Sequence, residues 1–240
     1  MITEHSDIVG SLLRPAELLG AQKQLGSGAI SQAQFKAIED RAVDDAIALQ
    51  ENVGLEIVTD GEMRRQSFQS QMTAAVSGFG VFDLDAFLWG EWHDGQGVRK
   101  TSRPRRLGAN AKLKRLGFLS ADEFIYLKAK TARRPKITLP SPGLWANFWS
   151  PKYSRGAYPT LELFFADIVA ILREEVAELL RLGARYIQID APQYGLLLDR
   201  ATRGFYEGLG WRLSDWLSLG IDLDNSLMAG FSDATFGFHI

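Results

Sequence analysis

Four polar residues stand where apolar, strand-like runs of the sequence end: Ser11, Glu62, Asp190 and His239. In parallel α/β folds the carboxyl ends of the strands meet at one edge, and that edge carries the active site. Two carboxylates on separate strand ends can converge on one cation. A Gly-Ser pair at a strand end can offer backbone N–H and hydroxyl donors to an anion. The four residues therefore predict one polar cleft at one edge of a parallel sheet.

Each of these residues also has a purely structural interpretation. Ser11 is a common type of turn residue. Glu62 and Asp190 both precede helical stretches, where an acidic side chain often caps the first turn. The residues alone leave both interpretations open.

The elements that would position these residues follow a βα rhythm. Two segments fit capping boxes, Ser31 with Gln34 and Ser120 with Glu123, and Gly54 and Gly183 are typical helix stops. The sequence predicts helices at 31–53, 120–131, 160–182, 211–219 and 223–229, and strands at 7–11, 55–59, 135–139, 185–189 and 235–240.

The region from about 77 to 115 breaks this rhythm. It is rich in glycine, aromatic residues and arginine, and we interpret it as a loop or hairpin inserted after the second strand of a single domain spanning 1–240. His93 lies within it, where it is either solvated or able to reach the site. The arginines from Arg99 to Arg115 form either a solvated face or a contact for a polyanionic tail.

Strands separated by helices predict a parallel α/β fold. No glycine-rich dinucleotide fingerprint follows the first strand, which argues against a Rossmann fold. A (β/α)8 TIM barrel needs eight strands and typically about 250 residues. About five strands are expected here, so we predict an incomplete barrel. The apolar strand at 235–240 has no following neighbour, so we expect a fragment that self-associates through this unpaired edge.

Composition excludes several classes of function. The chain has 240 residues, 46% of them hydrophobic, and a net charge of −2, so no nucleic-acid partner is expected. The sequence contains no run of ~18 apolar residues, so no membrane helix is predicted. The N-terminus lacks the features of a signal peptide, and we expect a cytoplasmic protein. With no cysteine, the chain has no disulfide, no thiolate nucleophile and no Cys-ligated zinc.

Five short segments in order resemble one known family. The chain looks like the C-terminal catalytic barrel of cobalamin-independent methionine synthase, and most closely like the smaller stand-alone relatives of that barrel. The segments that carry the resemblance are Val9-Gly10-Ser11-Leu12-Leu13-Arg14-Pro15, Gln50-Glu51-Asn52-Val53-Gly54-Leu55 with Thr59-Asp60-Gly61-Glu62, Leu139-Pro140-Ser141-Pro142, Tyr186-Ile187-Gln188-Ile189-Asp190-Ala191-Pro192 and Gly237-Phe238-His239.

The resemblance implies a 5-methyltetrahydropteroyltriglutamate-homocysteine S-methyltransferase-like enzyme of methionine biosynthesis. Zinc in that family binds a thiol substrate, such as homocysteine, as the thiolate and presents it to a folate methyl donor. The family ligates zinc with a His-x-Cys pair, a glutamate and a second cysteine. His239 corresponds to the histidine and Ile240 to the spacer, so the zinc site of these 240 residues is expected to be incomplete.

The resemblance also implies substrate-binding roles. Ser11 corresponds to the serine that contacts the homocysteine carboxylate, and Glu62 and Asp190 to the acids that bind its ammonium group. Trp149 follows the Pro-Ser-Pro loop, where an aromatic residue of the family stacks on the pterin. Ordinary loop packing of Trp149 is the alternative.

Two other classes of function stay open. One is a metal-free TIM-barrel enzyme in which Glu62 and Asp190 act as general acid and base. The other is a truncated fragment without catalytic activity, which acts by association if it acts at all.

Overall fold

The computed structural model describes residues 7–65, 70–81, 91–93, 99–101, 107–208 and 212–240. The helices are α1 Ala16–Gly26, α2 Gln32–Asn52, α3 Ser70–Ala75, α4 Ala121–Lys130, the 3-10 helix η1 Pro142–Phe148, α5 Leu161–Leu182, α6 Pro192–Leu196, α7 Arg200–Gly208 and α8 Leu213–Met228. The strands are β1 Ile57–Val58, β2 Val76–Gly80, β3 Glu91–His93, β4 Arg99–Thr101, β5 Gly108–Arg115, β6 Arg134–Pro135, β7 Ile137–Pro140, β8 Tyr186–Asp190 and β9 Thr235–His239.

The strands that position the site are parallel. β1 pairs with β6, and β7, β8 and β9 pair in that order. A single residue, Lys136, separates β6 from β7, and its backbone N–H donates to the Val58 carbonyl over 2.9 Å. The register places Pro140 beside Asp190 and Asp190 beside His239. The carboxyl ends of these strands therefore share one edge, as predicted.

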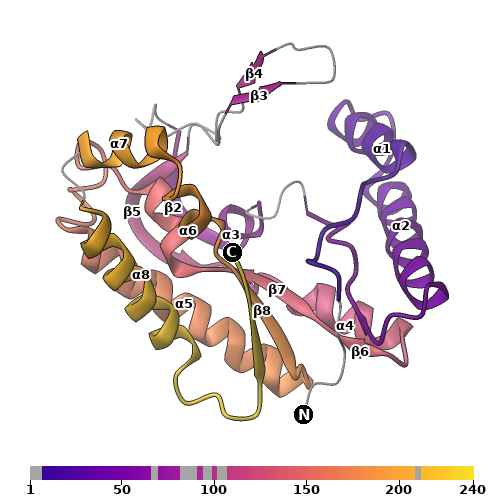
Figure 1. Cartoon of the computed structure of the whole chain (residues 1–240). Helices are drawn as coiled ribbons and strands as arrows, with labels where there is room; N and C mark the ends of the chain where they lie inside the picture. Colours follow the sequence, from indigo (N-terminus) through magenta and orange to yellow (C-terminus); the bar gives the residue numbers. More distant parts are fainter. Residues whose placement is uncertain (1–6, 66–69, 82–90, 94–98, 102–106, 209–211) are drawn as a thin grey trace.

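Side chains alternate between the two faces of these strands. Ile137, Leu139, Ile187 and Ile189 are buried in a large core cluster to which α5 contributes much of its apolar face. Figure 1 shows α5 and α8 lying along one side of β7, β8 and β9. Thr138 and Gln188, which lie at intervening positions, are polar and belong to the opposite face.

A second apolar cluster joins the N-terminal helices to β1. Its buried members come from α1, α2, α4 and the β1 region: Leu18, Ala21, Phe35, Ala42, Val43, Ala46, Ile47, Val58, Met63 and Leu127. Helix α1 was not predicted from the sequence.

Two predicted helices are confirmed together with their end signals. Helix α2 begins with a capping box formed by Ser31 and Gln34, and Gly54 follows it with a φ of 85°. Thr160 caps the N-terminus of helix α5, where its hydroxyl accepts from the Leu163 N–H, and Gly183 follows the helix with a φ of 99°. The strands predicted at 135–139, 185–189 and 235–240 are also present.

The strand predicted at 7–11 is wrong, because this segment has no ladder partner. Side chains donate hydrogen bonds to the backbone carbonyls that would otherwise pair with a neighbouring strand. Lys136 Nζ donates to the Ile8 carbonyl, Gln188 Nε2 to the Val9 carbonyl and Thr59 Oγ1 to the Gly10 carbonyl. The segment is therefore fixed in place without regular secondary structure.

The capping box predicted at Ser120 is also wrong. Ser120 makes no side-chain cap, and the Glu175 carboxylate instead accepts from the backbone N–H groups of Leu119 and Ser120, at 2.7 and 2.9 Å. Glu123 cannot reach back to Ser120 because its carboxylate binds Arg65.

The C-terminal helices also differ from the prediction. The two helices expected at 211–219 and 223–229 are one helix, α8. Gly220 does not interrupt this helix, and its missing side chain leaves room for the Tyr194 hydroxyl. Helices α3, α6 and α7 were not predicted, and the strand expected at 55–59 is only two residues long.

The region that breaks the βα rhythm forms antiparallel strands. β2 pairs with β5 and β3 with β4. The β2–β5 register shifts between Ser77 and Phe79, where Gly78 has a φ of 107° and a Cβ would lie 2.8 Å from the Lys112 carbonyl. His93 is in β3, paired with Arg99, and part of the arginine-rich segment lies outside the described residues.

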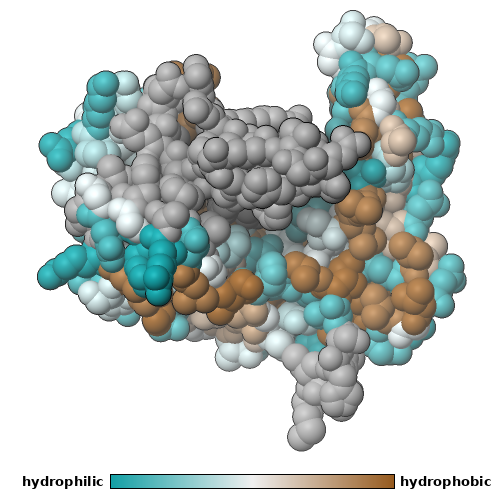
Figure 2. All heavy atoms as spheres, turned by 45° about the horizontal axis from the view of Figure 1, so that its top comes forward, coloured by the Kyte–Doolittle hydropathy of each residue, from teal (hydrophilic) through white to brown (hydrophobic). Residues whose placement is uncertain are grey.

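Exposed apolar side chains come from several elements. On the face shown in Figure 2, brown apolar patches alternate with teal hydrophilic residues. Leu13 is 97% and Ile240 is 68% exposed. Among the residues that the structure describes, no helix is both long and apolar enough to cross a membrane.

Candidate functional site

Glu62 lies in a turn just after β1 and has an unusual backbone. Its φ of 54° is in the left-handed region, which is uncommon for a residue with a side chain and often occurs at functional sites. Asp60 Oδ1 accepts from the Glu62 N–H over 2.9 Å, and the Leu12 N–H donates to the Gly61 carbonyl over 3.0 Å. These contacts hold the turn against the N-terminal segment.

The Glu62 carboxylate is buried and receives three donors. Ser11 Oγ donates to Oε2, while Thr138 Oγ1 at 2.6 Å and Arg65 Nη1 at 3.1 Å donate to Oε1. Burial favours the neutral acid, but the charge of Arg65 and the two hydroxyl donors outweigh it and lower the pKa of Glu62. Glu62 is therefore a fixed negative charge.

Gly10 allows the N-terminal segment to come this close. A Cβ at Gly10 would lie 2.9 Å from Glu62 Oε1 and 2.9 Å from Thr138 Cγ2, nearer than real Cβ contacts come. A larger residue would push either the Ser11 segment or the Glu62 carboxylate away. Glycine at this position is thus a requirement of the site geometry.

Arg65 connects Glu62 to a second acid. Its Nη2 lies 2.7 Å from Glu123 Oε2, and both the guanidinium and its partners are nearly inaccessible to solvent. Because Arg65 donates to two carboxylates and to Thr138, its charge is compensated from both sides.

Asp60 is the third acid of this group. It is 1% exposed, and its Oδ2 has no hydrogen-bond partner among the described residues. Burial, followed by the negative charge of Glu123, raises the pKa of Asp60 to about 7. Asp60 therefore exchanges its proton near neutral pH, unlike Glu62.

Asp190 and His239 form the second half of the site. His239 Nδ1 lies 3.3 Å from Asp190 Oδ1, and Gln188 Nε2 donates to the same oxygen over 2.7 Å. Burial raises the pKa of Asp190, and the nearby charge of Glu62 acts in the same direction despite the Gln188 hydrogen bond. The carboxylates of Asp190 and Glu62 therefore interact electrostatically within one polar site.

The structure joins the four sequence-predicted residues in two pairs, Ser11 with Glu62 and Asp190 with His239. Trp149 makes different contacts. Its indole N–H donates to the Tyr158 carbonyl over 3.2 Å, and its ring packs on the large core cluster. These contacts of Trp149 are those expected for ordinary loop packing.

Sequence reasoning missed several residues of this site: Arg65, Lys136, Thr138 and Gln188. A signal for three of them was present, because Lys136, Thr138 and Gln188 occupy alternate positions of otherwise apolar strands. Arg65 lies in a turn, where no periodicity distinguishes it.

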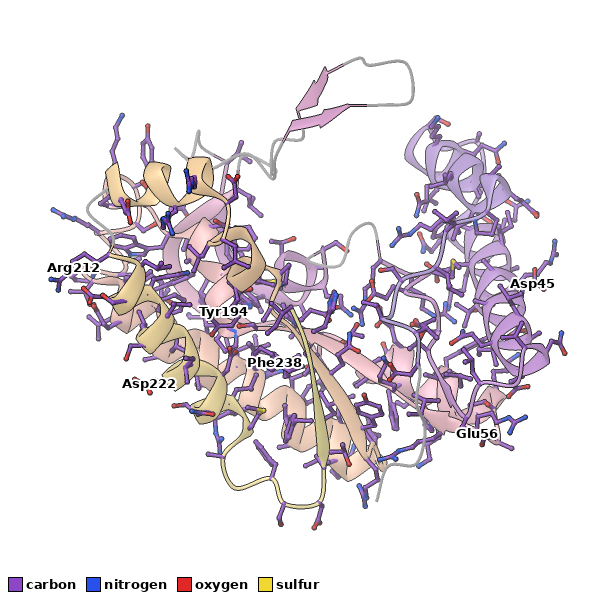
Figure 3. The ribbon with its side chains drawn as sticks, in the orientation of Figure 1. Asp45, Glu56, Tyr194, Arg212, Asp222 and Phe238 are labelled. Atoms are coloured by element: carbon purple, nitrogen blue, oxygen red, sulfur yellow. The ribbon has the colours of Figure 1, made fainter. Side chains whose placement is uncertain are left out.

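Another polar group lies beyond the ends of β7 and β9. Asp224 of α8 accepts from Ser141 Oγ and from the Tyr194 hydroxyl, each at 2.7 Å. The Tyr194 ring is 6.1 Å from the ring of Phe238, and Figure 3 shows the two side chains near the strand ends. These contacts anchor α6 and α8 to the sheet edge.

A cavity of 570 Å³ lies against Arg65, Gln71 and Glu123. Its lining also includes α3 and residues 116–119, but not Ser11, Glu62, Asp190 or His239. This cavity is thus separate from the cluster at the strand ends.

The described side chains do not provide the set of donors that a bound metal ion needs. Among the described residues, no group of three or more His, Cys, Asp or Glu side chains could hold one. His239 contributes one imidazole, and the sequence contains no cysteine. These residues do not make a complete zinc site, which normally needs three protein ligands in an enzyme.

Comparison with known proteins gives a consistent result. Residues 4–91 match the family described as "Cobalamin-independent synthase, Catalytic domain". A 5-methyltetrahydropteroyltriglutamate–homocysteine methyltransferase from Thermosynechococcus vestitus is 30% identical over 203 residues, which cover 85% of this chain and 25% of the relative. The chain spans about half the length, 52% and 51%, of other curated relatives that it matches.

Two solved structures share the fold. A protein from Listeria monocytogenes, provisionally assigned as a vitamin-B12-independent methionine synthase, has a TM-score of 0.72 at 21% identity, over 99% of this chain and 65% of that one. A B12-independent methionine synthase from Shewanella sp. W3-18-1 in complex with selenomethionine has a TM-score of 0.61 at 19% identity, over 88% of this chain and 53% of that one. The resemblance seen in the sequence motifs is confirmed: this chain is related to the catalytic domain of the cobalamin-independent methionine synthases.

Proposed function

We propose that this chain provides the amino-acid-binding half of a methionine-synthase-type methyltransferase, which moves a methyl group from a folate donor to the thiol of homocysteine. The observation that carries the proposal is the cluster of Ser11, Glu62, Asp190 and His239 at the carboxyl edge of the parallel strands. The reaction forms a sulfur–methyl bond, breaks the donor's nitrogen–methyl bond and releases the thiol proton.

Asp190 is the better placed of the two acids to receive an ammonium group. Its contacts with described residues involve Oδ1, which leaves the lone pairs of Oδ2 for a ligand. Burial and the charge of Glu62 disfavour the ionised carboxylate of Asp190 when no cation is bound. A bound ammonium ion would offset both effects.

Glu62 would contribute mainly through its fixed charge. Three of its roughly four acceptor positions are already taken by Ser11, Thr138 and Arg65. Ser11 would then rotate its hydroxyl from Glu62 to the substrate carboxylate. The same half of the site would thus contact both charged ends of an amino acid.

His239 would be the contribution of this chain to a zinc site. His239 would be one of the residues that hold such an ion, and the chemistry that the ion would supply is to favour the thiolate form of a thiol. Asp190 at Nδ1 would fix the orientation of the imidazole and leave Nε2 for a ligand. Because the described residues do not complete the site, the roles proposed for this chain are binding and orientation of the substrate.

The proposed architecture is part of a (β/α)8 barrel. The parallel order β1, β6–β7, β8, β9 and the fold of the Listeria protein support this arrangement. Trp149 remains the candidate for pterin contact, although a conformational change would be required to release it from its packing position.

A second candidate is metal-free acid–base catalysis by Glu62 and Asp190. The observation that favours it is the opposite direction of their pKa shifts, lowered for Glu62 and raised for Asp190. Catalysis that survives exhaustive chelation would support this candidate over the methyltransferase.

The experiment that tests the proposal is calorimetric titration of homocysteine into the 240-residue chain and into two variants. Glu62→Gln should weaken binding by at least about tenfold, since the fixed negative charge that attracts the ammonium group is lost. Glu56→Gln is the matched control, because Glu56 forms an exposed ion pair with Arg133 and should leave affinity unchanged. No homocysteine binding to the unmodified chain, or equal loss in both variants, would refute the proposal.

A further inference from the structure

We propose that Lys136 is a positioning residue that holds both halves of the site in register. This inference rests on the proposed function, because the site it orders is the one assigned to homocysteine. Lys136 touches neither Ser11 nor Glu62, and it acts through Gln188 and through the backbone of the N-terminal segment.

Lys136 is a fully buried lysine, with an exposed fraction of 0%. Its Nζ donates to Asp7 Oδ2 at 3.0 Å, to Gln188 Oε1 at 2.7 Å and to the Ile8 carbonyl. An ammonium group has three N–H donors, so these three acceptors satisfy it completely. A buried charge is tolerated only when it is paired in this way, which makes the geometry around Lys136 exacting.

The lysine determines which way the Gln188 amide points. Because the ammonium can only donate, it must face the amide oxygen, and the NH2 group must then face the other way. That NH2 group donates to Asp190 Oδ1 at 2.7 Å and to the Val9 carbonyl at 2.5 Å. A reversed amide would place N–H groups against the ammonium and its oxygen against the Asp190 carboxylate.

The two arms of this network end at the two halves of the site. One arm runs from Lys136 through Asp7, Ile8 and Val9 to the segment that carries Ser11. The other runs through Gln188 to Asp190, which contacts His239. The Lys136 cation therefore links the segment of Ser11, the proposed contact for the substrate carboxylate, to Asp190, the proposed contact for its ammonium group.

The first test replaces the charge and keeps the approximate shape. Lys136→Met should weaken homocysteine binding by about tenfold or more, measured by calorimetry on folded protein. Lys128→Met is the matched control, because Lys128 donates to the Leu182 carbonyl at the end of α5, away from this network. Unchanged affinity in Lys136→Met, or equal loss in the control, would overturn the proposal.

A second test separates the charge from packing. The chain contains no cysteine, so Lys136→Cys would be the single thiol. Alkylation in denaturant with 2-bromoethylamine and refolding restores an ammonium group at nearly the lysine length, whereas 1-bromopropane gives a neutral side chain of similar size. The aminoethyl form should recover affinity to within about threefold and the propyl form should not. Equal affinity of the two forms would show that only packing matters. Unmodified chain refolded in parallel is the control.

A third test asks whether Lys136 acts through Gln188. Gln188→Leu should also weaken homocysteine binding, and the double variant with Lys136→Met should be little weaker than either single variant, because both break one chain of contacts. If the fold-losses of affinity in the two single variants multiply in the double variant, Lys136 does not act through Gln188.

The positioning role can also be tested without a ligand. Hydrogen exchange of the Leu12 amide, which donates to the Gly61 carbonyl, should accelerate in Lys136→Met while exchange in α5 stays unchanged. If the unmodified chain fails to bind homocysteine, the proposed function fails, and this exchange result still decides the positioning role. Unchanged exchange at Leu12 would overturn it.

Discussion

His239 Nδ1 lies 3.3 Å from Asp190 Oδ1, across the parallel ladder that joins β8 and β9. The two residues are 49 positions apart in sequence and occupy paired positions in the register, so β-sheet geometry alone brings them together. With Asp190 ionised, the proton of a neutral imidazole resides on Nδ1 and Nε2 is available as a lone-pair donor. The strand register thus orients His239 as its proposed role as a zinc ligand would require.

Substitution of Gly10 should disturb the site with little change elsewhere. The Cβ of Gly10→Ala would lie 2.9 Å from Glu62 Oε1, so we expect destabilisation of about 1–3 kcal/mol and a clear loss of homocysteine affinity. Chemical denaturation and calorimetry provide the measurements. Gly20→Ala in α1 is the control, because its Cβ has open space and alanine favours a helix. Equal behaviour of the two variants would contradict the close approach at Gly10.

Asp60 should make stability depend on pH. Its pKa of about 7 in the folded state exceeds the ordinary value of 3.8, so the folded protein binds the proton more tightly than the unfolded chain. The stability gained from this proton is fully present below about pH 4 and is lost as the pH rises to about 7. The free energy of unfolding should therefore fall across this range by up to a few kcal/mol from Asp60 alone.

Asp60→Asn isolates this contribution. The variant retains an acceptor for the Glu62 N–H but cannot titrate, so its stability should fall less between about pH 4 and pH 7 than that of the unmodified chain. Other buried acids, such as Glu175 and Asp224, are present in both proteins and cancel in the comparison. Parallel stability curves for the two proteins would show that Asp60 does not titrate in this range.

Zinc should bind this cysteine-free chain far more weakly than a protein that carries the cysteine ligands implied by the family resemblance. Among the described residues, no three His, Cys, Asp or Glu side chains are grouped so that they could hold a metal ion. Elemental analysis after dialysis against a competing chelator is the measurement, with His239→Ala as the control for specific binding. Stoichiometric zinc that survives the chelator would show that other residues complete the site.

The edge of β9 should promote self-association. Among the described strands only β8 pairs with β9, and Phe238 and Ile240 are 43% and 68% exposed nearby. Sedimentation velocity should show a mass that increases with protein concentration. Charged variants Phe238→Lys and Ile240→Lys should reduce it, whereas Leu49→Lys on α2 should not. A monomer at every concentration would rule out association through this edge.

Much of the scaffold could be predicted from local sequence signals. The capping box at Ser31, the cap at Thr160 and the stops at Gly54 and Gly183 are encoded within a few residues, so α2 and α5 were predicted with close boundaries. The placement of Asp190 and His239 also followed from sequence, because both end apolar runs and parallel strands bring their carboxyl ends together.

The parts that escaped prediction depend on contacts between distant residues. Glu123 fits a local capping box, but it binds Arg65, 58 residues away, and this stronger charged contact overrides the local pattern. The 7–11 segment looks like a strand, yet its carbonyls are bonded by side chains from Thr59, Lys136 and Gln188. No short-range pattern reveals either arrangement.

A crystal structure of the chain with bound homocysteine tests most directly whether the strand-end cluster binds this amino acid. We predict that the ammonium group contacts Asp190 beside Glu62, that the carboxylate contacts Ser11 and that the sulfur points toward His239. A homocysteine molecule bound elsewhere, or bound at this edge with its ammonium group away from both acids, would contradict the proposed binding roles.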